Sequence, residues 1–192
     1  MPRKPEYDRE ALIDRARDLF WKQGWAGTSL KDLERTLGLN PGSFYAAFGS
    51  KAALFELALD RYAENGVSRF EHLVKTHGPL GALQRYPALV IDGTTSPAKA
   101  CLLAKTVLEL GGQDTTIAER ANSHLSRMET LFADLFRKAQ ADGEIKTGLD
   151  PEVLARRYQS DLLGLRVSAE RKGVNADEIA RGIADQLASL AS

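Results

Sequence analysis

The sequence contains a single cysteine, Cys101, among its 192 residues. One cysteine excludes an internal disulfide framework and the multi-cysteine sites that hold zinc or iron-sulfur clusters. The sequence also lacks any uninterrupted apolar run of about 18 residues, the length that a membrane-spanning helix requires. Residues 1–7 include charged side chains where a secretory signal would lead into an apolar stretch. We therefore expect a cytoplasmic protein with neither a disulfide nor a membrane partner.

An excess of charge is also missing, because 26 basic side chains balance 26 acidic ones. A strongly basic composition would have indicated a nucleic-acid partner, so its absence argues against one. The distribution softens this argument, since residues 1–51 carry nine basic and seven acidic side chains. So small a local excess permits DNA binding but does not indicate it.

No stretch of the sequence sustains the apolar/polar alternation of a β-strand, whereas apolar residues recur at helical spacing throughout. The sequence therefore predicts an all-α fold. Glycine, proline and the capping residues Asp, Asn, Ser and Thr divide the chain into successive helices. We expect helices over about 8–24, 28–38, 40–48, 51–75, 80–91, 98–110, 116–141, 150–172 and 175–191.

The two short predicted helices, 28–38 and 40–48, are joined by a tight glycine turn, and Pro41 suits the first position of the second helix. Such a unit can place its second helix in the major groove of DNA. At about 1.5 Å per residue this helix spans roughly 13 Å, comparable with a groove about 12 Å wide. Periodicity alone fits equally well two packed helices with no DNA-binding role.

The two faces of the 40–48 helix suit a position in the groove. Phe44 and Phe48 share one face, which Leu33 and Leu37 of the preceding helix can cover. Small residues on the opposite face would let the backbone approach the bases, while hydroxyls, helix N-termini and a lysine can meet phosphates. The candidate DNA-binding residues are Thr28, Ser29, Asn40, Pro41, Gly42, Ser43, Tyr45, Ala46 and Lys51.

Three blocks of this region closely resemble the DNA-binding domain of the TetR family of repressors. The blocks are Thr28-Ser29, Gly38-Leu39-Asn40-Pro41-Gly42-Ser43-Phe44-Tyr45, and Phe48-Gly49-Ser50-Lys51-Ala52-Ala53-Leu54-Phe55. In that family they open the second helix, form the recognition helix and lead into the fourth helix, respectively. The resemblance is detailed over about residues 8–65 and continues beyond them only as a run of helices of suitable number and length.

The resemblance implies a DNA-binding transcriptional regulator, specifically a repressor that a small-molecule inducer releases from its operator. It implies a three-helix helix-turn-helix domain over residues 8–68 and a larger helical ligand-binding and dimerisation domain over 69–192. It also implies a homodimer and a double-stranded DNA operator with an inverted repeat. By position, phosphate contacts fall to Thr28, Tyr45 and Lys51, and the base-facing surface to Asn40, Pro41, Gly42 and Ala46.

Two positions depart from the family pattern. Ala47 stands where many relatives carry histidine, and Pro41 replaces a residue that is commonly polar. Both changes remove hydrogen-bonding capacity from the recognition helix. We therefore expect more recognition by DNA shape and apolar contact than by paired hydrogen bonds to bases.

The C-terminal helices have apolar residues on more than one side. On the 150–172 helix, Val153 and Val167 lie off the main stripe, which comprises Leu154, Tyr158, Leu162, Leu165 and Ala169. Helices of this kind usually pack on two neighbours, here a core and a partner subunit. The alternative is that all the stripes face a single core.

Polar residues within apolar helices are candidates for a ligand pocket. They are Cys101, Lys105, Thr106, Glu109, His124, Tyr158 and Arg166. Each of them also fits a satisfied core group or a solvated side chain. Lys105 follows Cys101 by one helical turn and could favour a thiolate, and some TetR-family members sense electrophiles or oxidants with a cysteine near this place. The alternative for Cys101 is a small buried apolar side chain.

Two other functional classes find little support. The sequence has no nucleophile elbow, phosphate loop or dinucleotide glycine motif, and its histidines show no metal-ligand spacing. We therefore expect no catalysis, no cofactor and no metal. A helical adaptor that binds only proteins would leave the phosphate-contact candidates Tyr45 and Lys51 without a role.

Overall fold

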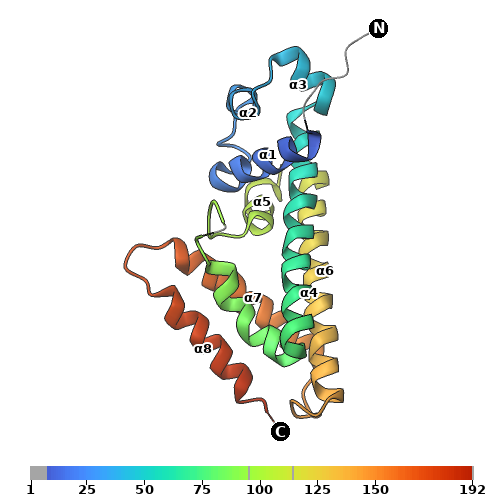
Figure 1. The fold of residues 1–192 in the computed structure, drawn as a ribbon, viewed down its shortest axis with the longest axis vertical. Helices are drawn as coiled ribbons and strands as arrows, with labels where there is room; N and C mark the ends of the chain where they lie inside the picture. The colour runs from blue at the N-terminus through green and yellow to red at the C-terminus, as the bar shows by residue number, and fades with distance from the viewer. Residues whose placement is uncertain (1–7, 95, 114, 192) are drawn as a thin grey trace.

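The computed structural model describes residues 8–94, 96–113 and 115–191, and within these ranges it is helical, as the sequence predicts. Figure 1 shows an elongated molecule with α1, α2 and α3 at one end, long α4 and α6 running side by side along it, and α7 and α8 at the other end. The helices are α1 (Arg9–Gln23), α2 (Leu30–Leu37), α3 (Pro41–Phe48), α4 (Lys51–Ile91), α5 (Leu102–Leu110), α6 (Thr115–Ala141), α7 (Pro151–Glu170) and α8 (Ala176–Ala188). None of these described helices is long and apolar enough to cross a membrane.

Side-chain caps fix where most of the helices begin. In each case a side-chain oxygen of the residue before the helix accepts a hydrogen bond from a free backbone N–H of the first turn, a contact worth about 1 kcal/mol. The capping residues are Asp8, Ser29, Asn40, Ser50, Asp150 and Asn175. Because each cap is local in sequence, these helix starts lie within a residue or two of the predicted ones.

Helix α4 contains the predicted break between residues 75 and 80. Gly78 has φ 73° and ψ 179°, so the helical path is interrupted there and resumes at Pro79. A positive φ of this size favours glycine, and proline suits the first position of a new helix. α4 is therefore two helical segments with a sharp break.

The start of α5 corrects the expected helix over 98–110. The helix begins at Leu102, and Cys101 is its N-cap rather than a residue inside it. The physical reason is a competing acceptor, because Glu170 Oε1 on α7 accepts hydrogen bonds from the backbone N–H groups of Lys99 and Ala100, at 2.6 and 2.8 Å. This carboxylate holds the segment before Cys101 out of the helix.

Two buried apolar clusters stabilise the molecule, and they follow packing rather than sequence order. The first joins α1, α2, α3 and the start of α4 to α5 and the start of α6. The second joins the later part of α4 to the rest of α6, α7 and α8. The helix-turn-helix thus shares a core with α5, so contacts extend across the predicted boundary between residues 68 and 69.

Candidate DNA-binding surface and ligand cavity

The turn between α2 and α3 has the geometry that the sequence predicts. Ser29 and Asp32 form a reciprocal capping box at the start of α2, and Gly38 ends the helix in the left-handed conformation, with φ 69° and ψ 32°. Asn40 Oδ1 accepts a hydrogen bond from Ser43 N at 2.8 Å and so caps α3. The covering residues Leu33, Leu37, Phe44 and Phe48 are all buried. The opposite face of α3 is left to the surface.

The outer face of α3 is open, uncharged and made mostly of small residues. Asn40, Pro41, Gly42, Tyr45 and Ala46 are exposed, and the Tyr45 side chain is 50% exposed. Ser43, also a candidate, is partly buried. A Cβ built on Gly42 would meet only Asn40 Oδ1, at 3.5 Å, so packing inside the chain does not require a glycine there. This face can come close to another surface.

Thr28 is the one DNA-contact candidate whose side chain is hidden. It is 1% exposed, and its hydroxyl donates a 2.7 Å hydrogen bond to the carbonyl oxygen of Gly24. A buried hydroxyl that is already bonded cannot reach a phosphate without rearrangement, so the contact expected of Thr28 would require its side chain to move. The adjacent Ser29 is exposed at the N-terminus of α2, where free N–H groups favour an anion.

Lys51 lies at the start of α4 but is partly occupied within the protein. Its Nζ donates a 2.6 Å hydrogen bond to the Trp25 carbonyl oxygen and lies 4.1 Å from the centre of the Trp25 ring. Burial lowers the pKa of Lys51 from its usual value, and the nearby Glu109 carboxylate partly opposes this shift. An ammonium group has three N–H donors, and the carbonyl uses one of them.

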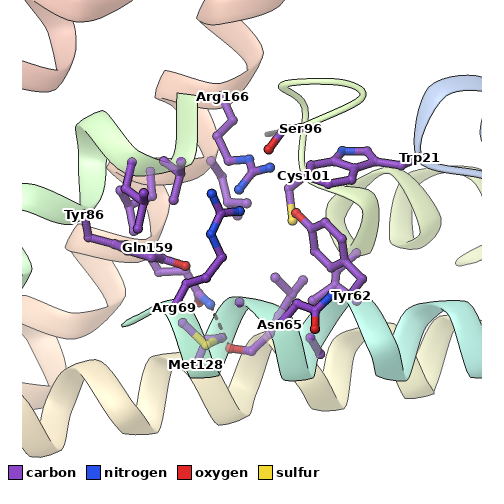
Figure 2. Close-up of a pocket in the computed structure, with 18 of the residues that line it drawn as sticks. Trp21, Tyr62, Asn65, Arg69, Tyr86, Ser96, Cys101, Met128, Gln159 and Arg166 are labelled. Atoms are coloured by element: carbon purple, nitrogen blue, oxygen red, sulfur yellow. Dashed lines mark hydrogen bonds between the residues drawn. The ribbon is translucent and has the colours of Figure 1, made fainter. Parts of the chain in front are cut away.

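A cavity of about 430 Å³ lies between the helix-turn-helix end and the body of the molecule. Figure 2 shows its labelled side chains, which come from α1, α4, α7, α6 and the segment before α5. Two of the seven predicted pocket residues, Cys101 and Arg166, line it. Cys101 is buried and lies beside the Tyr62 hydroxyl in Figure 2.

The other five predicted pocket residues lie outside this cavity and have partners within the protein. Lys105 Nζ donates to the Trp21 carbonyl at 2.9 Å, so it serves the end of α1 rather than a Cys101 thiolate. Glu109 Oε2 accepts a 2.7 Å hydrogen bond from Trp25 N. Thr106 donates a hydrogen bond to a backbone carbonyl within α5. His124 is hydrogen-bonded to Asp60, and the Tyr158 hydroxyl donates to the Leu83 carbonyl.

The cavity also contains polar and aromatic residues that the sequence did not indicate. Trp21 on α1, Tyr62 and Arg69 on α4, and Tyr86 near the end of α4 all line it. Trp21 lies near the end of α1 and Tyr62 lies within α4. Only the packing of α1 against α4 brings their rings to 4.8 Å, so no local signal could have identified them.

Comparisons with known proteins find matches for both the N-terminal and the C-terminal part of the chain. The chain matches the family models described as bacterial regulatory proteins, tetR family, over residues 12–58, and Tetracyclin repressor-like, C-terminal domain, over 79–186. It is 30% identical over 178 residues to the HTH-type transcriptional repressor ComR of Escherichia coli K12, covering 90% of this chain and 84% of ComR.

Solved structures share the whole architecture. A TetR-family transcriptional regulator from Cytophaga hutchinsonii superposes with a TM-score of 0.84 at 23% identity, covering 95% of this chain and 94% of that one. A cysteine mutant of the TetR-family regulator CifR, complexed with 26-bp double-strand operator DNA, gives 0.83 at 25% identity, covering 99% and 100% of the two chains.

An N-terminal helix-turn-helix with an exposed second helix, set on a helical body, defines the protein as a DNA-binding transcriptional regulator. Both domain matches and the long alignment with ComR identify the family within this class. The chain belongs to the TetR family.

Proposed function

We propose that this protein is a homodimeric transcriptional repressor that binds an inverted-repeat operator in the cytoplasm and leaves it when a small molecule fills the cavity. The observation that carries this proposal is the position of Trp21. It belongs to α1 of the DNA-binding unit, and its ring is also a wall of the cavity. A ligand that moves this ring would act on the DNA-binding unit directly.

On the DNA, α3 enters the major groove with Asn40, Pro41, Gly42 and Ala46 toward the bases. Hydroxyls of Ser29, Ser43 and Tyr45 and the ammonium of Lys51 meet phosphates, which position the protein without reading sequence. The absence of charge from the described residues of α3 supports recognition by shape.

The dimer forms through α7 and α8. Val153, Val167 and Ile179 are exposed apolar residues on these helices. Gly164 shares a face of α7 with the two valines, and a Cβ added there would meet nothing within 4 Å. A glycine inside a helix costs about 1 kcal/mol relative to alanine, and close approach of a second helix would account for it. Two copies then present two recognition helices to an inverted repeat.

The signal passes from the cavity to α1 through α5 and the segment before it. Trp21 Nε1 donates a 2.6 Å hydrogen bond to the Ala100 carbonyl, directly before Cys101. Lys105 and Glu109 bond to the backbone at the end of α1 and in the turn that follows. A ligand releases DNA only if it prefers the conformation whose recognition helices are wrongly spaced. Movement of α4, which carries Lys51, accompanies that of α1.

Cys101 offers a covalent form of the same switch, in which an electrophile or oxidant modifies the thiol instead of filling the cavity. Its place in the cavity wall beside Tyr62 supports this form. Cys101→Ser tests it. Release of DNA by oxidants or electrophiles that persists in this variant would eliminate Cys101 as the sensor and leave the reversible ligand.

Selection of binding sites from random double-stranded DNA tests the proposal as a whole. We expect the recovered sequences to share an inverted repeat whose half-sites are about one helical turn apart, roughly 34 Å. Sedimentation should show a dimer without DNA, and Gly164→Arg should shift it toward monomer. Recovery of no common sequence, or a stable wild-type monomer at micromolar concentration, would contradict the proposal.

A further inference from the structure

The cavity has an unusual balance of charge. Three arginines line it, Arg17, Arg69 and Arg166, and its described lining contains no aspartate or glutamate. Positive charge placed in a partly enclosed, largely apolar space is costly unless an anion compensates for it. Such an anion can be a carboxylate of the protein or a bound ligand.

Arg17 is compensated. Its terminal nitrogens pair with Asp14 at 2.9 Å and with Asp18 at 2.7 Å, both on α1. The guanidinium group is therefore held along its own helix, and its charge is largely balanced where it touches the cavity. Arg17 therefore serves as a control for Arg166.

Arg166 is not compensated in this way. Its Nε donates a 2.8 Å hydrogen bond to the Lys99 carbonyl. Among the described residues no carboxylate lies within ion-pair distance of it, and Glu170 attracts its charge only from further away. The acidic residue one turn further along α7, Glu170, directs its Oε1 to the backbone N–H groups of Lys99 and Ala100. The two terminal nitrogens of Arg166 are therefore available to a ligand.

Arg69 brings a second positive charge to the same part of the cavity. Figure 2 shows Arg69 and Arg166 extending into it from α4 and α7. Burial raises the pKa of the Tyr86 hydroxyl, and both guanidinium groups oppose this shift. After the hydrogen bonds from Thr94, Arg69 also contributes to lowering the pKa of the Asp92 carboxylate. Part of the charge of Arg69 is therefore balanced within the protein, which leaves Arg166 as the stronger anion site.

The rest of the wall is aromatic and apolar. Trp21 and Tyr62 pack edge to face at 4.8 Å, and Phe132 and Tyr86 form a second pair at 6.1 Å. Burial raises the pKa of the Tyr62 and Tyr86 hydroxyls, so both stay protonated at neutral pH and can donate hydrogen bonds. The volume of about 430 Å³ suits a compound of one to three rings.

We propose that the cavity selects an organic carboxylate with a flat apolar body, and that Arg166 binds the carboxylate through its terminal nitrogens. The ring system lies among the four aromatic side chains, and the tyrosine hydroxyls supply further donors. This inference rests on the proposed function, since it names the chemical class of the ligand that fills the cavity.

Three probes of one shape test the inference on the full-length protein by isothermal titration calorimetry: 2-naphthoate, 2-naphthamide and 2-naphthylmethylammonium. A charge-assisted bidentate contact predicts that the carboxylate binds roughly tenfold to a hundredfold more tightly than the amide. The ammonium compound should bind least. Equal affinities, a preference for the cation, or binding of none of the three would overturn the inference.

Single substitutions test which arginine binds the carboxylate. Arg166→Gln should abolish the preference for the carboxylate over the amide, Arg166→Lys should retain part of it, and Arg17→Gln should leave it unchanged. Thermal melting of each variant shows whether it is folded, and Arg166→Lys serves if Arg166→Gln is not. A preference that survives in a folded Arg166→Gln protein, or disappears in Arg17→Gln, would show that Arg166 is not the anion site.

A gel shift on the selected operator with the same probes separates this inference from the proposed function. Carboxylate binding that depends on Arg166 but leaves the protein on its operator would contradict release by the cavity ligand and keep the anion site. Release by the amide and the carboxylate at equal concentration would contradict only the anion site.

Discussion

The DNA-binding end and the cavity are built by opposite means. The α2–turn–α3 unit is held by contacts between residues close in sequence, such as the Ser29–Asp32 box and the Asn40 cap. The cavity is assembled from five helices and a connecting segment, and its aromatic pairs join residues tens of positions apart. A unit held by local contacts keeps its geometry when the other helices move. A cavity formed between several helices changes shape when those helices move. The difference suits a rigid DNA-binding unit, α2–turn–α3 (the reader), attached to a deformable ligand cavity (the sensor).

The largest effect should come from filling the open face of the reader. Gly42→Leu leaves internal packing nearly unchanged, because a Cβ there meets only the Asn40 side chain. On DNA the added side chain would hold α3 away from the bases. We expect operator affinity to fall to the level of nonspecific binding, roughly a thousandfold or more, in a quantitative gel shift.

The matched control is Ala88→Leu, which places the same leucine side chain at an exposed position near the end of α4. It should retain wild-type operator affinity. If Gly42→Leu also retained it, the outer face of α3 would not be the DNA-reading surface, and the contrast between reader and sensor would fail at its first step.

The next largest effect should come from the contact between α5 and the turn after α1, which joins the two regions. Glu109→Ala removes the carboxylate that accepts the Trp25 N–H at 2.7 Å, leaving a partly buried donor without its partner. We expect the free energy of unfolding to fall by about 1–3 kcal/mol in a denaturant titration. Glu109→Gln keeps an acceptor oxygen and should lose less. Equal losses in the two variants would assign the effect to charge rather than to the hydrogen bond.

Two phosphate-contact variants should differ in their salt dependence. Lys51→Gln removes a cation, so the slope of log affinity against log salt should become less steep by about 0.9, with roughly tenfold weaker binding at low salt. Tyr45→Phe removes only a hydroxyl, so it should weaken binding to all sequences without changing the slope. A changed sequence preference in either variant would contradict a role confined to phosphates.

The smallest expected effect concerns the α4–α6 contact near the reader. Hydrogen bonds from Arg120 lower the pKa of Asp60, with a further contribution from His124. Because the folded pKa lies below the free value of about 3.9, this contribution to stability is complete above that pH and is lost as pH falls through the lower value.

Asp60→Asn should therefore remove about 1 kcal/mol of stability at pH 7 and make the loss of stability below about pH 4 shallower, as measured by urea titrations across pH. Asp142→Asn changes an exposed carboxylate that pairs with Lys138 on the surface and should leave the acid dependence close to wild type. A steeper acid loss in Asp60→Asn would contradict the assignment.

The sequence predicted most of the fold because helix ends are encoded locally. Asp8, Ser29, Asn40 and Asp150 cap where their positions suggested, and the break before Pro79 occurs at Gly78. The start of α5 was predicted wrongly, since the acceptor that delays it, Glu170, lies on α7. Nothing near residue 98 in the sequence could reveal that contact.

Predictions for side chains depended on the same distinction. The exposed face of α3 follows from its own periodicity, and all the candidates on it are exposed except Ser43, which is partly buried. Thr28 was expected at the surface, but its hydroxyl reaches back to Gly24. Among the pocket candidates, polar character on an apolar helix did not separate Arg166, which lines the cavity, from Lys105, which serves the end of α1. That separation requires the packing of helices far apart in sequence.

The chain contains two tryptophans, and each belongs to one of the two regions compared above. Trp21 forms part of the cavity wall with Arg166 5.7 Å from its ring centre, whereas Trp25 carries the ammonium of Lys51 at 4.1 Å. Indole emission depends on nearby charge and on exposure to water. A Trp25→Phe protein should therefore report ligand entry through fluorescence, and a Trp21→Phe protein should report the release of Lys51 onto a phosphate. The two variants would thus report separately on the cavity and on the DNA-binding end.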